Sequence, residues 1–201
     1  MAITKANLLA ALKEWIKAST ETVASVRMAL AIAEALKWLS EREKWSCLHV
    51  LDAEETLAAA ATSIAWPANF REFDCIVLND GTSDSYPLEK CTFDEIKRYR
   101  SSSSNSGEPD KFCSRGQKFE LNKSCSQIFT AKVSYWRYHP DQADIIFGDE
   151  FKESLCYAVV GAYLDGKARH SKAVYYWTMA ATKLPKKLKD VKLRKTRYRD
   201  L

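Results

Sequence analysis

The chain has 201 residues, and 46% of them are apolar, which suffices to bury the core of one domain or two small ones and excludes disorder of the whole chain. No apolar run reaches about 18 residues, so we expect no membrane span and no membrane partner. The opening residues, MAITKANLLAALKEWIK, lack the apolar core and small-residue cleavage site of a secretion signal.

Charge is distributed unevenly along the chain, although the net value is only +5. Residues 151–201 carry 13 Lys and Arg against 4 Asp and Glu, whereas residues 51–100 carry 5 against 10. Most of the positive excess lies from Lys183 onward. The sequence therefore predicts a neutral or acidic body with a basic tail appended to it.

The first predicted segment, residues 4–44, is helical. Apolar residues recur on one helical face at Leu8, Leu9, Leu12, Trp15 and Ile16. A second periodic run contains Val23, Val26, Leu30 and Leu36, and Ser19 or Thr20 can cap it after a break. Because residues 1–66 contain neither Gly nor Pro, one long bent helix is the alternative.

The next segment changes its periodicity. Thr62, Ile64 and Trp66 alternate with polar or small residues before Pro67, which predicts a strand that leads into a turn. The preceding residues 54–61 are rich in Ala, which favours helix by propensity, and they stay open between helix and strand.

The middle of the chain reads as strands. In FREFDCIVL, alternation places Phe73, Cys75 and Val77 on one face, and Asn79-Asp80-Gly81 then signals a turn. SYPLEKC is predicted to be a second strand, with Pro87 confining it to a sheet edge or a bulge.

A short helix and three further strands follow. Thr92 and Glu95 have the spacing of a capping box, which opens a helix to about Tyr99. SSSSNSGEPD, residues 101–110, is a flexible loop by composition. KFCS, KFELN and QIFTAKVSYWRYH are predicted strands, separated by turns at Arg115-Gly116 and at residues 122–124. Together these segments predict one small antiparallel sheet with one short helix.

Two helices close the predicted fold after a linker at residues 139–148. The first begins at Asp149-Glu150, ends at Asp165-Gly166 and carries an apolar stripe of Phe151, Leu155, Val159 and Ala162. The second is stopped by Pro185 and carries Ala173, Trp177, Ala180 and Leu184. The adjacent aromatics Tyr175, Tyr176 and Trp177 are interpreted as core.

These elements predict an α+β fold, in which the terminal helices form an α-helical bundle that carries an inserted small antiparallel β-sheet domain. The predicted parts are N-terminal helices at 1–45, a β-rich domain with one short helix at 46–140, a C-terminal helix pair at 141–184 and an extended basic tail at 185–201.

A catalytic, cofactor or metal site is not predicted. His49, His139 and His170 are scattered, and His139, which precedes a proline in a linker, is interpreted as a surface residue. No Gly-x-Ser-x-Gly phrase or glycine-rich phosphate loop is present. Asp141, Asp144, Asp149 and Glu150 could bind a metal cation, but a helix start and a polar linker explain these acids better.

The six cysteines form no Cys-x-x-Cys pair, which argues against a common zinc site. Their even number permits disulfides. We interpret them instead as small, buried apolar residues in a reducing cytosol. We therefore expect no enzyme and no cofactor.

The order of elements resembles the head–tail adaptor, or connector, proteins of tailed bacteriophages. The shared phrases are Trp66-Pro67-Ala68-Asn69-Phe70-Arg71, CIVLNDG, Pro87-Leu88-Glu89, TFDEIKRY, Tyr135-Trp136-Arg137-Tyr138, ESLCYAVVGAYLDGK and AVYYWTMAATKL. They span roughly residues 40–184. The alanine-rich residues 57–61 and the numerous cysteines depart from the pattern.

The resemblance implies a virion structural protein that forms a homo-oligomeric ring of about twelve copies. Such a ring docks under the portal protein, contacts tail or nozzle proteins and leaves a channel for double-stranded DNA without sequence specificity. The protein would be made in the host cytoplasm and would reside at the head–tail interface of the virion. An acidic lumen would let DNA slide without sticking, and the acidic 51–100 region is compatible with one.

The basic tail is the predicted binding segment, reaching to the portal or to a neighbouring copy. Its interspersed apolar residues favour docking to protein, since phosphate binding does not need them, and their alternation would suit an added strand. The predicted residues are Lys186, Lys187, Leu188, Lys189, Val191, Lys192, Leu193, Arg194, Lys195, Arg197, Tyr198 and Arg199. A solvated end is the plain alternative for this tail. A small basic nucleic-acid-binding module is the alternative for the whole chain, although no helix-turn-helix phrase or RNA-binding aromatic motif supports it.

Overall fold

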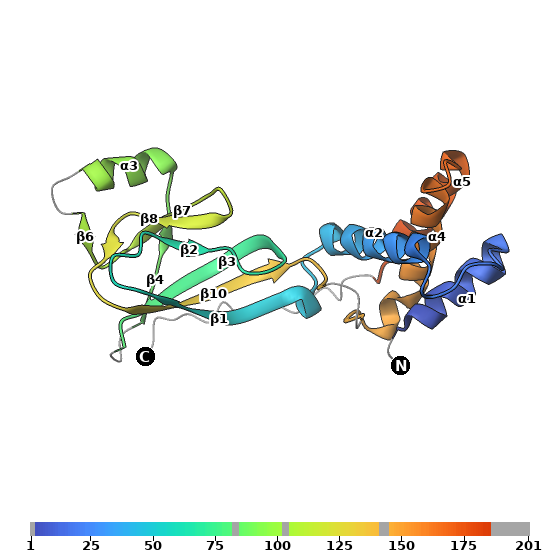
Figure 1. The fold of residues 1–201 in the computed structure, drawn as a ribbon, viewed down its shortest axis with the longest axis horizontal. Coiled ribbons are helices and arrows are strands. Elements are labelled where there is room, and N and C mark those ends of the chain that lie inside the picture. The colour runs from blue at the N-terminus through green and yellow to red at the C-terminus, as the bar shows by residue number, and fades with distance from the viewer. Residues whose placement is uncertain (1–2, 82–84, 102–104, 141–144, 186–201) are drawn as a thin grey trace. The chain divides into compact units, whose positions relative to one another are not determined.

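The computed structural model describes residues 3–81, 85–101, 105–140 and 145–185. The chain divides into two compact units, a helical one drawn from Met1–Ala35 and Gln142–Leu201 and a β-rich one formed by Leu36–Asp141 (Figure 1). The described helices and mainly antiparallel sheets confirm the predicted α+β class. The arrangement of the terminal helices as a bundle stays a prediction, and the extended tail lies outside the described residues.

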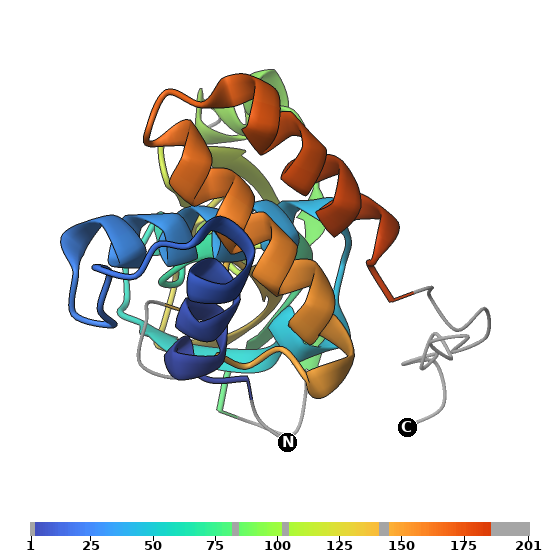
Figure 2. The same ribbon diagram turned by 90° about the vertical axis from the view of Figure 1, so that its right-hand side faces the viewer.

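The helical unit is organised around α4, Lys152–Asp165, which follows the 3-10 turn η2, Asp149–Phe151. This helix contacts both α1, Lys5–Ile16, and α5, His170–Thr182 (Figure 2). Every residue from Ser154 to Leu164 is buried except Tyr157, which is half-buried. The predicted apolar stripe of Phe151, Leu155, Val159 and Ala162 covers only part of the buried surface of α4, because neighbouring segments cover this helix on several sides.

The contact between α4 and α5 depends on a small residue. A Cβ atom at Gly161 would lie 3.1 Å from the indole ring of Trp177, closer than side chains normally approach. The indole Nε1 of Trp177 donates to Asp165 Oδ2 over 2.7 Å, which fixes the ring near the end of α4. Because Gly161 has no side chain, the indole ring of Trp177 can pack directly against α4.

The two N-terminal helices are separated by a break. Thr4 and Asn7 form a capping box at the start of α1, and Lys17 ends that helix in the left-handed conformation. The next helix, α2, spans Val26–Arg42, and Ser25 caps it by accepting from the backbone N–H of Met28. The prediction that Ser19 or Thr20 caps this helix was wrong, since the intervening turns continue to Ser25.

The buried face of α2 agrees with the predicted one only at Leu36, which is 4% exposed. Met28, Ile32 and Leu39 are buried, whereas Val26 is 76% and Leu30 is 66% exposed. Val23 is exposed as well. Alanines 31 and 35 complete the buried face, so the wrong stripe was chosen because large aliphatic residues were given more weight than small ones.

Two four-stranded sheets and one two-stranded sheet make up the described β-structure, rather than the single sheet that was predicted. The first sheet has the order β1-β10-β3-β4, formed by His49–Leu57, Phe129–Arg137, Phe70–Asn79 and Ser85–Pro87. The second has the order β2-β8-β7-β5, formed by Ser63–Ala65, Lys118–Leu121, Lys111–Arg115 and Glu89–Lys90. A further short 3-10 turn, η1, spans Ser46–Leu48.

Several predicted strands are confirmed, among them those around residues 62–66, 111–114 and 118–122. The undecided segment 54–61 is strand to Leu57 and turn beyond it. Pro87 lies on an edge strand as predicted. SYPLEKC is not one strand, because β4 pairs with β3 whereas β5 pairs with β7 in the other sheet.

The predicted alternation of β3 is broken by a bulge. The pairing with β10 shifts between Cys75 and Phe73, which leaves Asp74 as the extra residue. Ile76 and Leu78 are buried, and Phe73 packs against the same core although it has the opposite parity. Because of the bulge, odd-numbered Phe73 and even-numbered Ile76 and Leu78 all face the same core. A strict two-residue alternation would place them on opposite faces of the sheet and cannot predict this.

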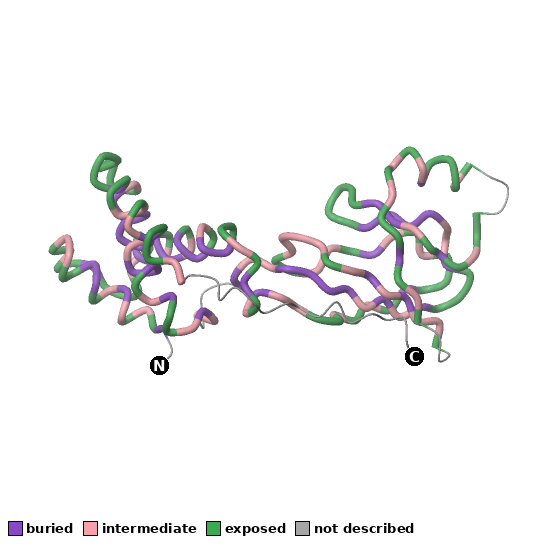
Figure 3. Tube along the Cα trace, turned by 180° about the vertical axis from the view of Figure 1, so that it is seen from behind, coloured by how far each residue is buried: buried purple, intermediate pink, exposed green. Residues whose placement is uncertain are grey.

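One core joins the two sheets, and the buried positions run along their strands in Figure 3. In this core Phe112 and Phe119 of the second sheet pack together, with ring centroids 5.6 Å apart. Phe70 of β3 meets Phe119 edge-on at 5.5 Å. Such aromatic pairs add to the stabilisation that burial of this core provides.

The predicted short helix is α3, Phe93–Ser101, and it packs on β7. Its capping box is confirmed, since Glu95 Oε2 accepts from the backbone N–H of Thr92 and Thr92 Oγ1 accepts from that of Glu95. The following segment is not wholly a loop, because β6, Ser106–Gly107, pairs with β9, Ser124–Cys125. No helix in the described ranges is both long and apolar enough to cross a bilayer.

One buried polar contact ties the break between α1 and α2 to α4. The hydroxyl of Tyr163 donates to Glu21 Oε1 over 2.6 Å, and Ser25 Oγ donates to Glu21 Oε2 over 2.7 Å. Tyr163 is 1% exposed and Glu21 is 8% exposed. These hydrogen bonds, that of Tyr163 first, lower the pKa of Glu21 below its ordinary value of 4.5.

We expect Tyr163→Phe to lower the free energy of unfolding at neutral pH by about 1–3 kcal/mol, because a buried carboxylate loses its donor. The stabilisation is present above the carboxyl's ordinary pKa and is lost as the pH falls through the lowered pKa of the folded state. The difference between variant and parent should therefore shrink in acid. Urea unfolding across pH measures it, with Tyr157→Phe as the matched control. An equal difference at every pH would contradict this role of Glu21.

Candidate interaction surfaces

The residues predicted to bind the portal or a neighbour, Lys186 through Arg199, all lie outside the described residues. Their docking role stays a prediction. The described residues instead show an aromatic surface, a hollow beside it and a junction at the end of α2, none of which the sequence analysis predicted.

The aromatic surface consists of Trp15, Tyr157, Tyr175 and Tyr176, contributed by α1, α4 and α5. Ring centroids lie 4.6 Å apart for Trp15 and Tyr157, and 6.3 Å apart for Tyr157 and Tyr176. Tyr175 meets Tyr176 edge-on at 5.3 Å and is 58% exposed. The prediction that Tyr175 belongs to the core was therefore wrong. Half-buried Tyr and Trp side chains are typical of protein-binding surfaces.

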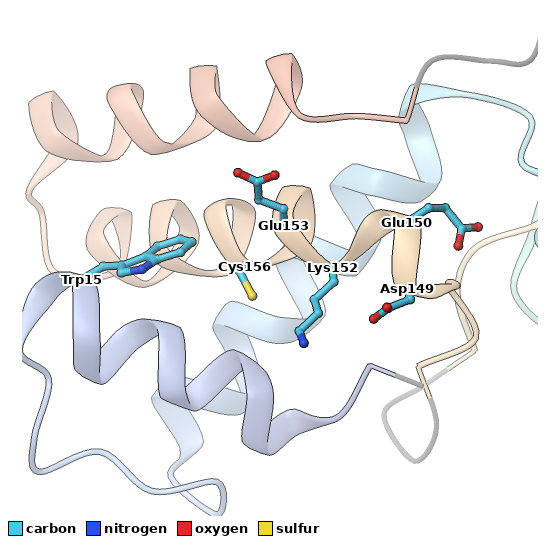
Figure 4. A pocket seen from close by; sticks show the side chains of 6 residues that line it. All are labelled: Trp15, Asp149, Glu150, Lys152, Glu153 and Cys156. Atoms are coloured by element: carbon cyan, nitrogen blue, oxygen red, sulfur yellow. The ribbon is translucent and has the colours of Figure 1, made fainter. Parts of the chain in front are cut away.

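A hollow of about 420 Å³ adjoins this surface, and Trp15 lines both. Its other lining residues are Asp149, Glu150, Lys152, Glu153 and Cys156. Figure 4 shows Lys152 and Cys156 pointing toward α1 and Glu153 pointing toward α5. Glu153 also forms an ion pair with Lys183, whose Nζ lies 2.9 Å from Glu153 Oε1. The rim thus carries more negative than positive charge, which suits a cationic side chain of a partner.

The phrase Trp66-Pro67-Ala68-Asn69-Phe70-Arg71 ends at a junction with α2. Trp66 and Phe70 pack together with centroids 4.6 Å apart and join the core of the β-rich unit. Asn69 takes a positive φ of 57°, and its carbonyl accepts from the backbone N–H of Tyr138. This turn starts β3, and Arg71, the second residue of the strand, reaches the C-terminal end of α2.

Three carbonyl oxygens at or just beyond that helix end accept hydrogen bonds from side chains. Arg71 Nη1 donates to the carbonyls of Ser40 and Glu43, the latter over 2.8 Å. Trp45 Nε1 donates to the carbonyl of Leu39 over 2.7 Å. A guanidinium at a helix C-terminus also complements the partial negative charge there. The phrase therefore has a structural role in joining β3 to α2.

The cysteines of the described part of the chain are buried or half-buried thiols. All six cysteines are free. Burial raises the pKa of Cys75, Cys91, Cys113 and Cys125, and raises that of Cys156 to about 11, so these thiols are protonated at neutral pH.

Of the histidines, His49 stacks on Trp136 and lies 3.1 Å from Asp74, and His170 is exposed beside Asp165. His139 was predicted to be a surface residue and is 8% exposed, because its backbone N–H donates to the buried Ser40 Oγ. Among the described residues, no group of three or more potential ligands could hold a metal ion. Asp141 and Asp144 lie outside them.

A family model described as SU10 adaptor protein matches residues 3–199. The chain belongs to this family of phage head–tail adaptors. A comparison with curated proteins finds no match. The resemblance inferred from the order of strands and helices is confirmed, and the adaptor is a phage structural protein whose family role is interaction with other virion components.

The aromatic surface of the adaptor was missed because it joins three helices that are distant in sequence. The one available signal was Tyr157, which interrupts the small and aliphatic residues of α4. The junction was missed because the phrase was interpreted as the entry to the β-structure, without a partner for Arg71.

We expect Arg71→Ala to lower the free energy of unfolding of the adaptor by about 1–3 kcal/mol, because buried carbonyls at the end of α2 lose their donor. Arg71→Lys should restore part of this loss, since an ammonium can reach the helix end but lacks the fork of a guanidinium. Chemical denaturation measures both.

Arg98→Ala on the exposed side of α3 is the matched control and should change stability by less than about 0.5 kcal/mol. A loss at Arg71 no larger than that at Arg98 would show that the junction contributes nothing to folding.

Proposed function

We propose that this adaptor forms a homo-oligomeric ring that docks under the portal protein, joins the DNA-filled capsid to the tail and leaves a channel through which DNA passes at ejection. The observation that carries the proposal is the family match over residues 3–199. By analogy with other adaptors the ring would contain about twelve copies. It would reside at the head–tail interface of the virion, after synthesis in the host cytoplasm.

The chemistry of the described residues supports a structural role. Burial raises the pKa of the Cys156 thiol to about 11, which disfavours a nucleophile, and the side-chain contacts of Arg71 and Glu95 serve helix ends. The half-exposed aromatic surface and the adjacent hollow are features that bind proteins. We therefore propose that the adaptor acts without catalysis and without a cofactor, through contacts with the portal, with tail or nozzle proteins and with its own copies.

The tail from Lys186 to Arg199 is the proposed docking arm toward the portal or a neighbouring copy. Its positive charge would steer it to an acidic surface. Its apolar residues, Leu188, Val191 and Leu193 among them, would anchor it once there. Phosphates of passing DNA offer a weaker, sequence-independent contact.

We expect a chain ending at Leu184 to keep the stability of the full chain and to lose portal binding, because the described core ends before this residue. The measurement is a nuclease-treated pull-down from infected-cell lysate with both chains as bait. Recovery of a portal-sized protein by the full chain alone supports the proposal. Equal recovery by the shortened chain would remove the tail from the docking contact.

The alternative, a basic nucleic-acid-binding module, rests on the same tail charge. It predicts that the full chain binds duplex DNA with an affinity that falls steeply with salt. If the full chain recovers material only when the nuclease is omitted, this alternative replaces the adaptor ring. A matched variant with Leu188, Val191 and Leu193 changed to Ser keeps the charge, so it should bind DNA normally and lose the portal.

A further inference from the structure

The helical unit carries a second apolar surface, on α2, that the described residues leave uncovered. We call it the α2 ridge and define it as Val23, Val26, Arg27 and Leu30. Val26 is 76% exposed, Leu30 is 66% exposed and Val23 is 42% exposed. The spacing of Val26, Arg27 and Leu30 places them along one side of the helix, and Val23 lies in the turn before it. Large aliphatic side chains gathered this way are typical of a protein contact.

The charge of the α2 ridge is positive where its apolar residues are most exposed. Arg27 lies between Val26 and Leu30, and its side chain is 54% exposed although it approaches Glu21 at 3.6 Å. The aromatic surface is bordered by the opposite charge, because Asp149 and Glu150 are exposed at the hollow beside it and outnumber Lys152, which also lines the hollow. The ridge is aliphatic and cationic, whereas the aromatic surface is bordered by a hollow and by carboxylates.

We propose that the α2 ridge of one copy packs on the aromatic surface of the next copy, with Leu30 against Tyr175 and Tyr176 and Arg27 toward the carboxylates of the hollow. The proposal rests on the ring put forward under "Proposed function" and assigns the surfaces that form it. A ridge of helix side chains packs naturally into a depression flanked by aromatic rings.

Like-with-like contacts are disfavoured by the same charges. If the ridge met a second ridge around a twofold axis, Arg27 would face Arg27. If two hollows met, Asp149 and Glu150 would face their own copies. A contact between different surfaces joins opposite charges, and such a head-to-tail contact is the kind that generates rings.

The test uses two variants that each remove one surface. Leu30→Glu adds a carboxylate to the ridge, and Tyr175→Glu adds one to the aromatic surface. Both positions are exposed, so both variants should keep the circular dichroism spectrum and the thermal midpoint of the parent. Leu51→Glu, at a position on β1 that is 68% exposed, is the matched control for adding a charge to an apolar site.

We expect each variant alone to weaken self-association by about thirtyfold or more, as measured by sedimentation velocity, and Leu51→Glu to leave it unchanged. An equal mixture of Leu30→Glu and Tyr175→Glu should form a dimer and nothing larger. The intact ridge of the second variant can pack on the intact aromatic surface of the first, whereas every further contact is blocked.

Two results would overturn the pairing. Assembly of either variant alone, at the level of the parent, would show that its altered surface is not in the contact. A mixture that stays monomeric while the parent assembles would show that the two surfaces do not meet each other.

A second measurement decides the question if the purified parent is monomeric. A photo-reactive benzoylphenylalanine at position 30 is incorporated into assembled particles and irradiated. Cross-links to peptides that contain Tyr157 or Tyr175 of another copy support the proposal, and cross-links to any other site, or none, overturn it. Recovery of the portal by the parent in the pull-down tests the adaptor function separately, so a wrong interface and a wrong function give different results.

Discussion

The hydrogen bonds at the C-terminal end of α2 are the constraint on which much of the β-rich unit depends. Arg71 donates hydrogen bonds to the carbonyls of Ser40 and Glu43, and Trp45 donates one to the carbonyl of Leu39. These donors come from the start of β3 and from Trp45, three residues beyond the end of the helix. The end of α2, the turn before β3 and the first pairs of β3 with β10 therefore form one connected polar structure, beside a core of stacked aromatic rings.

The two kinds of polar group in this adaptor serve different ends. Buried ones, such as Glu21 with Tyr163 and Ser154 with the carbonyl of Ala180, hold helices in place. Exposed ones gather beside apolar surfaces, as at the hollow next to Trp15. A protein that assembles with other virion components needs this division, because the folded unit must be rigid before its surfaces can bind with specificity.

Much of the local structure could be predicted from the sequence, because its signals are short-range. The capping box of Thr92 and Glu95, the edge position of Pro87 and the strands at 111–114 and 118–122 each follow from a few neighbouring residues. The exposed ridge of α2 could not be predicted, since its aliphatic residues and the smaller buried ones both fit a helical period. Only the packing of the other helices shows which face is covered.

The sequence by itself predicted the helices at both ends of the chain, most of the strands between them and, through phrases such as that from Trp66 to Arg71, membership of the adaptor family. The tertiary structure decided how strands are shared between two sheets, the bulge at Asp74 and the meeting of Trp15, Tyr157 and Tyr176. The physical reason is the range of the forces involved. Caps and turns are satisfied within a few residues, whereas a sheet partner or an aromatic surface depends on groups that come together only when the whole unit packs.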